Sequence, residues 1–118
     1  MVARRDTNEK ISIDKDMLIE DIVLLLDDIQ SSLFEQAFKF REKSTFKVNS
    51  YDDFKKIIGE RGGFIRCGWD GTKKTEQAIK DETKATIRVI PFDENPKNLL
   101  CIYSGKPAKH EVIFAKAY

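Results

Sequence analysis

The stretch FIRCGWDGTKKTEQAIKDETKATIRVIPF, residues 64–92, decides the fold. It opens with an apolar run over 64–69 that predicts a strand, and the pair Asp70-Gly71 that follows is a typical turn signal. Residues 86–92 carry the clearest strand signal in the chain. A strand, a turn, a helix-length segment and a second strand in close succession predict helices that pack on a sheet.

The segment between these two strands is predicted to be a helix. Thr72 is placed to cap its N-terminus, and Glu76 lies in the first turn, where the helix dipole favours an anion. Ala78 and Ile79 are expected on the inner face. The helix is expected to end near Lys84.

The second strand shows the two-residue period of a pleated segment. Ile87 and Val89 share one face, and Pro91 places the end of the strand near a sheet edge. We expect a core built from apolar residues of three strands. Its expected members are Phe64, Ile87, Val89, Val112 and Phe114.

Working outward, the remaining chain divides into further elements. The expected elements are a short strand over 2–6, a long helix from about Asp16 to Lys43, a strand over 45–48, a short helix from Ser50 to about Ile58, a loop over 93–100 and a final strand over 112–118. This order predicts an α+β fold. A long N-terminal helix precedes a two-layer α/β sandwich with a mixed sheet, in the order strand, helix, strand, helix, strand, strand, and the two short helices cover one face.

The long helix has an unusually wide apolar surface. One group of apolar residues follows three-, four- and seven-residue spacing, and a second group lies next to it; the second group is Ile19, Val23, Leu26, Phe34 and Ala37. Together they cover about half the circumference, which is wider than the roughly 100° stripe of a surface helix. We therefore expect this helix to pack against two partners. The short strand before it is expected to belong to a larger domain.

Composition excludes several classes of protein. The 118 residues carry 21 Lys and Arg against 20 Asp and Glu, so the net charge of +1 gives no global attraction to nucleic acid or membrane. The sequence contains no run of 18 apolar residues and no secretory signal at its start, which predicts a cytoplasmic chain without membrane contact. Cys67 and Cys101 form no metal or disulfide pattern and are interpreted as free thiols.

A search for catalytic chemistry finds little. The one histidine, His110, has no nucleophile beside it in sequence and is interpreted as a solvated histidine. Residues 71–75 resemble a phosphate loop but lack its first glycine, so a turn followed by a helix cap explains them better. Several lysines flank the turns of the C-terminal part and are interpreted as solubilising; they are Lys73, Lys74, Lys97, Lys106 and Lys109. Residues alone therefore predict an α+β module without visible catalysis.

Stretches in collinear order over nearly the whole chain resemble one protein family. They are Arg4-Arg5-Asp6-Thr7, Glu9-Lys10, Ile29-Gln30 with Leu33, Gly63-Phe64, Trp69-Asp70-Gly71, Glu76, Ile79-Lys80-Asp81-Glu82-Thr83, Ala85-Thr86-Ile87-Arg88-Val89-Ile90-Pro91, Gly105-Lys106-Pro107-Ala108 and Phe114-Ala115-Lys116-Ala117-Tyr118. The chain thereby resembles the C-terminus of prolyl-tRNA synthetases of the archaeal and eukaryotic type, which some bacteria also have.

The resemblance implies a domain organisation. Residues 1–43 would be the tail end of the anticodon-binding domain, and residues 44–118 the C-terminal module, with a fold similar to the C-terminal domain of translation initiation factor 3. The implied role is a noncatalytic fragment of proline–tRNA ligase, a class II aminoacyl-tRNA synthetase that joins proline to tRNA(Pro) using ATP and magnesium. The module would support its own anticodon-binding and catalytic domains in an enzyme that is a homodimer. Tyr118 would contact the catalytic domain or tRNA.

One departure from the family concerns zinc. Many relatives have a structural zinc site of four cysteines, and its positions in this sequence are Asp70, Thr75, Cys101 and Ser104, so only one cysteine remains. Thr and Ser hydroxyls stay protonated near neutral pH and replace thiolates poorly as zinc ligands. We therefore expect no zinc and no other cofactor in this chain. Asp70, with a neighbouring threonine, is expected to hold the turn by hydrogen bonds instead.

Two functions of different classes remain open from the sequence. The first is the noncatalytic part of the ligase. The alternative is a free-standing RNA-binding or regulatory module with the same fold. The upstream reading frame distinguishes them, because codons for a catalytic domain that run into Ala3-Arg4-Arg5 would support the first.

Overall fold

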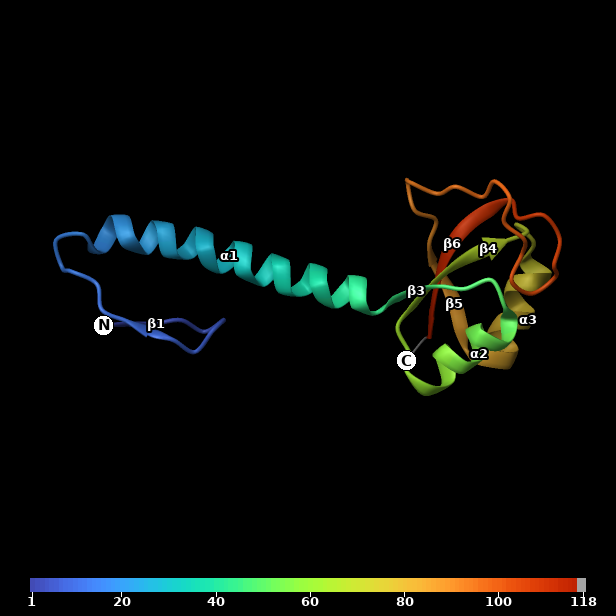
Figure 1. The fold of residues 1–118 in the computed structure, drawn as a ribbon, viewed down its shortest axis with the longest axis horizontal. Helices are drawn as coiled ribbons and strands as arrows, with labels where there is room; N and C mark the ends of the chain where they lie inside the picture. Colours follow the sequence, from blue (N-terminus) through green and yellow to red (C-terminus); the bar gives the residue numbers. More distant parts are fainter. Residues whose placement is uncertain (117–118) are drawn as a thin grey trace. The chain divides into compact units, whose positions relative to one another are not determined.

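The computed structural model describes residues 1–116 and divides the chain into two compact units, Met1–Glu42 and Lys43–Tyr118 (Figure 1). The expected α+β class is confirmed. The elements in chain order are β1 (Val2–Ala3), β2 (Lys10–Ile11), α1 (Leu18–Lys43), β3 (Thr45–Lys47), α2 (Tyr51–Glu60), β4 (Phe64–Trp69), α3 (Lys73–Thr83), β5 (Ala85–Val89) and β6 (His110–Lys116).

The first unit contains a hairpin that the sequence reading missed. Instead of one strand over 2–6, β1 pairs antiparallel with β2, and Figure 1 shows this hairpin alongside the N-terminal part of α1. Arg4 explains the attachment. Its guanidinium binds both carboxylate oxygens of Asp6, at 3.1 and 2.7 Å, and also reaches Asp28 on α1. Hydrogen bonds from Arg4 lower the pKa of Asp6 to about 2.

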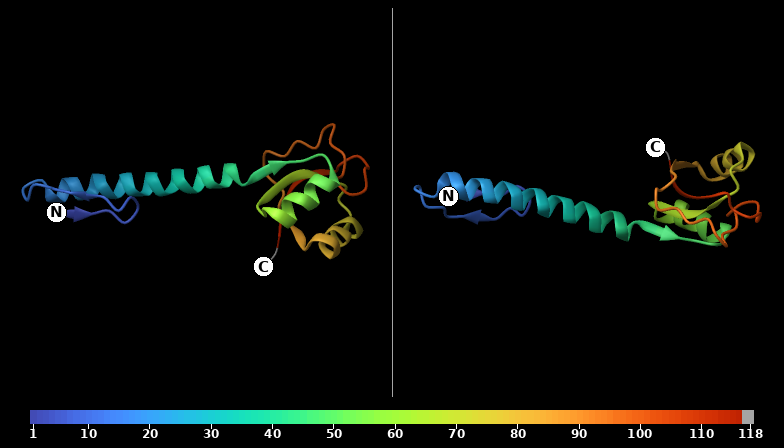
Figure 2. Two further views of the ribbon diagram at one scale, coloured as in Figure 1. Left: turned by 60° about the horizontal axis from the view of Figure 1, so that its bottom comes forward. Right: turned by 90° about the horizontal axis from the view of Figure 1, so that it is seen from above.

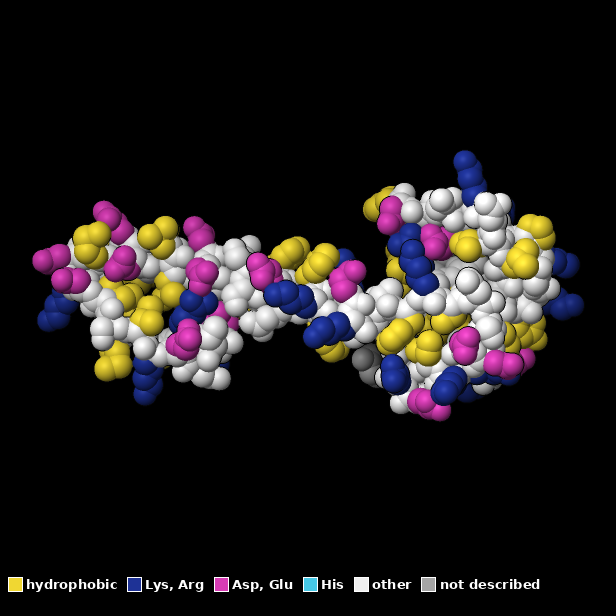
Figure 3. Space-filling model, in the orientation of Figure 1, with side chains coloured by type: hydrophobic (Ala, Val, Ile, Leu, Met, Phe, Trp, Pro, Cys, Tyr) yellow, Lys and Arg dark blue, Asp and Glu magenta, His cyan; other side chains and the backbone are white. Residues whose placement is uncertain are grey.

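Helix α1 has no buried residue within the described chain. Most of its apolar side chains lie exposed between charged ones, as Figure 3 shows, whereas Leu25 and Ile29 are half-buried. Ile19, Val23, Leu26 and Phe34 are each more than half exposed. The hairpin thus does not supply the two packing partners that the wide apolar surface of α1 led us to expect. The packing of this surface on a further domain stays a prediction.

The second unit has the predicted order of elements and a mixed four-stranded sheet. The strand order is β3-β4-β6-β5, with β3 parallel to β4 and the other two pairings antiparallel. Strand β5 lies at an edge, as Pro91 indicated. Both helices contribute to one core cluster with the same strands, so they cover one face, as expected (Figure 2).

The core follows from alternation along β4 and β6. Ile65 lies opposite Phe114, and Cys67 lies opposite Val112; all four side chains face the helices and are buried. Phe54 of α2 packs on this layer, with its ring 5.4 Å from that of Phe114. Burial of large apolar side chains of this kind contributes roughly 1.5–3 kcal/mol each.

Two residues of the expected core were assigned wrongly. Phe64 is exposed because it shares a face with Ala115, on the side of the sheet away from the helices. Val89 is 47% exposed because the pairing with β6 shifts between Ile87 and Val89. An extra residue at such a bulge moves the following side chain to the other face. Val112 and Phe114 are buried as predicted, and Ile87 packs against the core.

The structure also tests the predicted helix caps and the predicted state of the two cysteines. Thr72 caps α3, since its hydroxyl accepts a hydrogen bond from the Thr75 amide at 3.3 Å. Ser50 precedes α2 as predicted, but its side chain makes no capping hydrogen bond to the described residues. Both cysteines are free and buried. None of the helices within residues 1–116 is long and apolar enough to cross a membrane.

Candidate functional site

Three of the four positions that the resemblance assigned to zinc ligands lie in a hydrogen-bonded cluster around Asp70. We call Asp70, Thr72, Thr75 and Ser104 the Asp70 cluster. It joins the turn between β4 and α3 to a loop far along the chain. Three of its members are positions that the resemblance assigned to cysteine ligands, and the structure brings these three together.

The Asp70 carboxylate accepts four hydrogen bonds, two on each oxygen. Oδ1 accepts from the Thr72 amide at 3.0 Å and from the Thr72 hydroxyl at 2.9 Å. Oδ2 accepts from the Thr75 hydroxyl at 2.8 Å and from the Ser104 hydroxyl at 2.7 Å. Such short bonds to a charged acceptor are stronger than neutral ones. The carboxylate therefore holds the turn, the start of α3 and the distant loop in one arrangement.

The same contacts determine the protonation of Asp70. Burial alone would raise its pKa, but the hydrogen bonds from Ser104, Thr72 and Thr75 outweigh burial and lower the pKa to about 2. All of these groups donate to the carboxylate, so they stabilise its charged form. Asp70 is thus an ionised acceptor near neutral pH.

The expectation that Asp70 bonds to a neighbouring threonine is confirmed, and the bond from Ser104 is the part that local sequence reasoning missed. Ser104 is 34 residues from Asp70 in sequence, and no local pattern connects them. The one signal that could have found the contact is the family's cysteine spacing, which puts both residues in one ligand set.

The donor set does not fit zinc. The hydroxyls of Thr75 and Ser104 use their protons on Asp70, and a protonated hydroxyl is a poor substitute for a thiolate. Cys101 is buried, and no metal-binding group of three or more His, Cys, Asp or Glu side chains occurs in residues 1–116. The hydrogen bonds to Asp70 connect the same segments that four thiolates and a metal would connect.

We predict that the chain folds without zinc. Chelator should leave the thermal midpoint of the second unit unchanged, and elemental analysis of protein purified without chelator should find far less than one zinc per chain. The reason is the chemistry of the donors, because a structural site needs several thiolate or imidazole ligands to contribute to folding. Stoichiometric zinc together with chelator-induced unfolding would show that the prediction is wrong.

The lysines near these turns are solvent-exposed, and one of them packs closely. The stem of Lys109 lies over Gly71, where a Cβ atom would come within 2.8 Å of the Lys109 Cδ atom. The Lys109 amide also donates to the Trp69 carbonyl at 2.8 Å. Lys109 thus serves as part of the turn's packing.

His110 is partly buried rather than solvated. Its Nδ1 atom lies 3.1 Å from Oε1 of Glu94, and its ring stacks on Trp69 with centroids 6.2 Å apart. Within residues 1–116 the structure shows no Ser, Thr or Cys side chain hydrogen-bonded to His110. The arrangement is that of a structural histidine that holds a loop.

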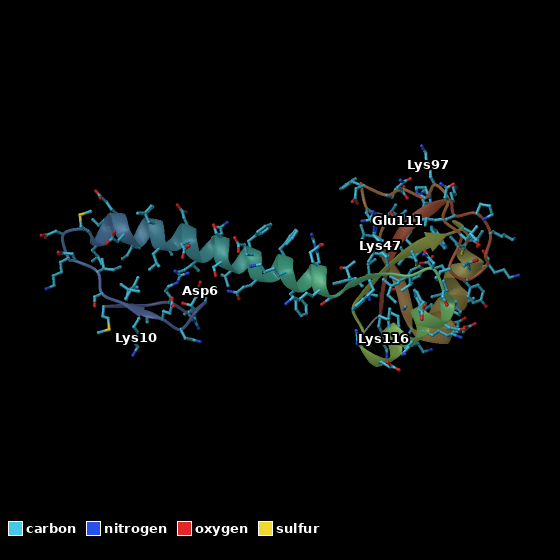
Figure 4. All side chains as sticks on the ribbon, in the orientation of Figure 1. Asp6, Lys10, Lys47, Lys97, Glu111 and Lys116 are labelled. Atoms are coloured by element: carbon cyan, nitrogen blue, oxygen red, sulfur yellow. The ribbon has the colours of Figure 1, made fainter. Side chains whose placement is uncertain are left out.

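A second polar network, which the sequence reading missed, lies on the sheet face away from the helices. Arg66 donates to Oε2 of Glu111 at 2.8 Å and to the Asp93 carbonyl at 3.2 Å. Glu111 is almost fully buried, and a hydrogen bond from Arg66 lowers its pKa, with a further contribution from Lys47 (Figure 4). The pairing joins β4, β6 and the loop after β5.

The comparisons with known proteins agree with each other. Residues 51–118 match the sequence model of a family described as "Prolyl-tRNA synthetase, C-terminal". Proteins named proline–tRNA ligase are similar over 99–100% of this chain: 48% identical in Amoebophilus asiaticus, 47% in Christiangramia forsetii and 50% in Prosthecochloris aestuarii. The chain covers 24%, 24% and 26% of these relatives and so spans about a quarter of their length.

Proposed function

Since this chain belongs to the prolyl-tRNA synthetase family, through the C-terminal region that its residues 51–118 match, we propose that it is the noncatalytic C-terminal part of a proline–tRNA ligase. The whole enzyme joins proline to tRNA(Pro) using ATP and magnesium. It works in the cytoplasm as a homodimer.

The observation that carries this proposal is the extent of the similarity. Proline–tRNA ligases match 99% of this chain at 48% identity, while the chain accounts for only 24% of their length. Supporting evidence comes from the chemistry of the second unit. Its conspicuous polar groups, the Asp70 cluster and the Arg66–Glu111 pair, hold turns and loops together. The carboxylate that the Thr75 and Ser104 hydroxyls contact has a pKa of about 2, so it is too weak a base to activate them.

The role of the chain in the enzyme is structural. We propose that residues 1–43 belong to the anticodon-binding domain and that residues 44–118 form the C-terminal module. The exposed apolar face of α1, which includes Ile19 and Phe34, would then pack on the remainder of the anticodon-binding domain. Tyr118, which lies outside the described residues, would contact the catalytic domain or the tRNA.

The test compares the 118-residue chain with the product of the full reading frame. We expect the full-length protein to charge tRNA(Pro) with proline, and the 118-residue chain to show no ATP–pyrophosphate exchange above a blank, because the chemistry belongs to the other domains. The full-length protein is the positive control for that exchange. A full-length protein that charges no tRNA(Pro), or proline-dependent exchange by the short chain, would contradict the proposal.

A further inference from the structure

Lysines gather at one end of the second unit, where the turn after β4 meets the loop that leads into β6. Lys73 and Lys74 lie in the first turn of α3, directly after the turn. Lys106 and Lys109 come from the loop. We call these four residues the lysine patch. All four are exposed, and Figure 3 shows Lys or Arg side chains that stand out from the edges of this unit.

Hydrogen bonds and packing bring the two segments of the lysine patch together. The Lys109 amide donates to the Trp69 carbonyl at 2.8 Å, and the Lys109 stem lies over Gly71. The Ser104 hydroxyl donates to the Asp70 carboxylate at 2.7 Å. The loop is therefore fixed on the turn that starts α3, and its lysines lie beside those of the helix.

The part of the loop that carries Lys106 is also held by its own backbone. The Cys101 amide donates to the Lys106 carbonyl at 2.7 Å, and the Gly105 amide donates to the Cys101 carbonyl at 3.0 Å. The Ile102 amide donates to the Gly68 carbonyl at 3.0 Å and ties this turn to β4. A surface whose backbone is ordered before contact loses less entropy when it binds a partner.

Carboxylates do not neutralise the lysine patch. None of its four side chains forms an ion pair with the residues that the structure describes. Residues 95–110 contain three lysines and no Asp or Glu, in a chain that has 20 acidic residues. On the helix side, Asp70 and Glu76 are the nearest acidic residues along the chain, and each oxygen of Asp70 already accepts two hydrogen bonds. A local excess of positive charge remains.

Two of these lysines occupy positions where a cation costs stability. The N-terminal end of a helix carries a partial positive charge, so Lys73 and Lys74 in the first turn of α3 are unfavourable there. Side chains that break a local rule of this kind are found chiefly at functional sites. A bound anion would turn the cost into a gain, because it would meet the ammonium groups and the helix end together.

The composition of the lysine patch favours phosphate over the surface of another protein. Lysine is depleted in protein–protein interfaces, whereas lysines and helix N-termini are usual donors to nucleic-acid phosphates. The neighbouring aromatic rings are already engaged: Tyr103 packs edge-on against Tyr51, and Trp69 stacks on His110. The patch thus offers charge without a platform on which bases could stack.

We propose that the lysine patch binds the phosphate backbone of the tRNA that the full-length enzyme charges. This proposal rests on the proposed function, which supplies the tRNA. Phosphate contacts position a nucleic acid but carry no sequence information. The patch therefore adds affinity for tRNA in general, and the selection of tRNA(Pro) falls to contacts outside it.

The salt dependence of tRNA binding tests the proposal on the full-length protein. The patch variant carries Lys73→Gln, Lys74→Gln, Lys106→Gln and Lys109→Gln, which remove the charges and keep most of each stem. Each lysine that meets a phosphate adds about 0.7–0.9 to the slope of log affinity against log salt, so the slope should become shallower by about 3. The Kd for tRNA(Pro) should rise at least about tenfold at about 50 mM salt, and the difference should narrow as salt increases. A noncognate tRNA should lose affinity by the same factor.

A control variant removes the same charge from exposed lysines elsewhere in the unit. It carries Lys43→Gln, Lys56→Gln, Lys84→Gln and Lys116→Gln. The register places Lys116 beside Ala85, at the opposite end of β6 from the patch. This variant should keep the slope of the unmodified protein. Proline-dependent ATP–pyrophosphate exchange, measured without tRNA, should be the same in all three proteins.

Stability separates a binding role from a structural one. In the 118-residue chain, the double change Lys73→Gln and Lys74→Gln should raise the urea midpoint slightly, because it removes cations from the positive end of α3. A lowered midpoint would show that these lysines support the fold, and the proposal would fail.

Other results would also overturn the proposal. These are equal slopes for the patch and control variants, a loss of affinity that is the same at every salt concentration, and a loss confined to tRNA(Pro). Loss of the homodimer in the patch variant would show that the lysines meet a protein surface instead. Charging by the unmodified full-length protein separates the two levels: charging with equal slopes rejects only this proposal, whereas no charging of tRNA(Pro) rejects the proposed function.

Discussion

Replacing Gly68 with alanine is expected to destabilise the second unit by about 3 kcal/mol, at the upper end of the usual cost of overpacking. A Cβ atom on Gly68 would lie 2.4 Å from the Leu100 carbonyl oxygen and 2.9 Å from the Ala108 Cβ atom. The segment after Leu100 is itself held to this strand, because the Ile102 amide donates to the Gly68 carbonyl at 3.0 Å. A backbone carbonyl that is fixed in this way cannot move aside cheaply.

Urea unfolding followed by Trp69 fluorescence measures this effect. Trp69 is the one tryptophan of the chain and lies at the end of β4, so it reports on the second unit alone. Gly59→Ala is the matched control: no heavy atom lies within 4 Å of its added Cβ, and the residue is within α2. That change should stabilise the unit by about 0.5–1 kcal/mol. If the Gly68→Ala variant and the unchanged protein have the same free energy of unfolding, the Leu100 carbonyl does not lie as close to Gly68 as described.

Replacing Asp70 with asparagine is expected to cost about 1.5–3 kcal/mol near neutral pH, the range for hydrogen bonds to a charged group. The asparagine NH2 group would replace one acceptor oxygen and face donors: the Thr72 amide and hydroxyl on one side, or the Thr75 and Ser104 hydroxyls on the other. The turn, the start of α3 and the loop at Ser104 would lose their common acceptor.

The stability lost in the Asp70→Asn variant should depend on pH, because the fold lowers the pKa of Asp70. The folded pKa of Asp70 is about 2, below its ordinary value of 3.8. Its contribution to stability is therefore complete above the ordinary pKa and is lost as the pH falls from about 4 to about 2. The difference in unfolding free energy between the two proteins should shrink over that range.

Urea unfolding by Trp69 fluorescence between pH 2 and pH 7 measures this difference. Asp52→Asn is the control, because Asp52 is an exposed carboxylate that forms an ion pair with Lys55 on the same helix. Surface pairs of this kind contribute little, so this variant should differ from the unchanged protein by no more than about 0.5 kcal/mol. A difference between the Asp70→Asn variant and the unchanged protein that stays constant with pH would exclude Asp70 as the titrating group.

Local patterns predicted the elements of the second unit because each depends on neighbouring residues. The strand over 64–69, the cap at Thr72 and the helix that ends before Lys84 all appear as expected. Lys84 itself adopts the left-handed conformation that commonly ends a helix. The shared core cluster also confirms that the two helices cover one face.

The errors arise where two segments meet. Val89 was placed in the core because its alternation with Ile87 is regular in the sequence, but the register with β6 shifts between them. The hairpin of the first unit was missed because two-residue strands carry almost no pattern, and β1 and β2 are identified by their pairing. In both cases the outcome depends on pairing with another strand, which a local sequence pattern does not contain.

The amino-acid sequence by itself determined the fold class, the order of elements and the family, because periodicity, caps and turns are local and the motifs are collinear along nearly the whole chain. The tertiary structure decided which distant groups meet. It brought Ser104 to Asp70, and Arg66 to Glu111 and to the loop after β5. The physical reason is that a hydrogen bond or an ion pair depends on distances of about 3 Å between atoms. Only packing of the sheet and its loops brings residues so far apart in sequence within that distance.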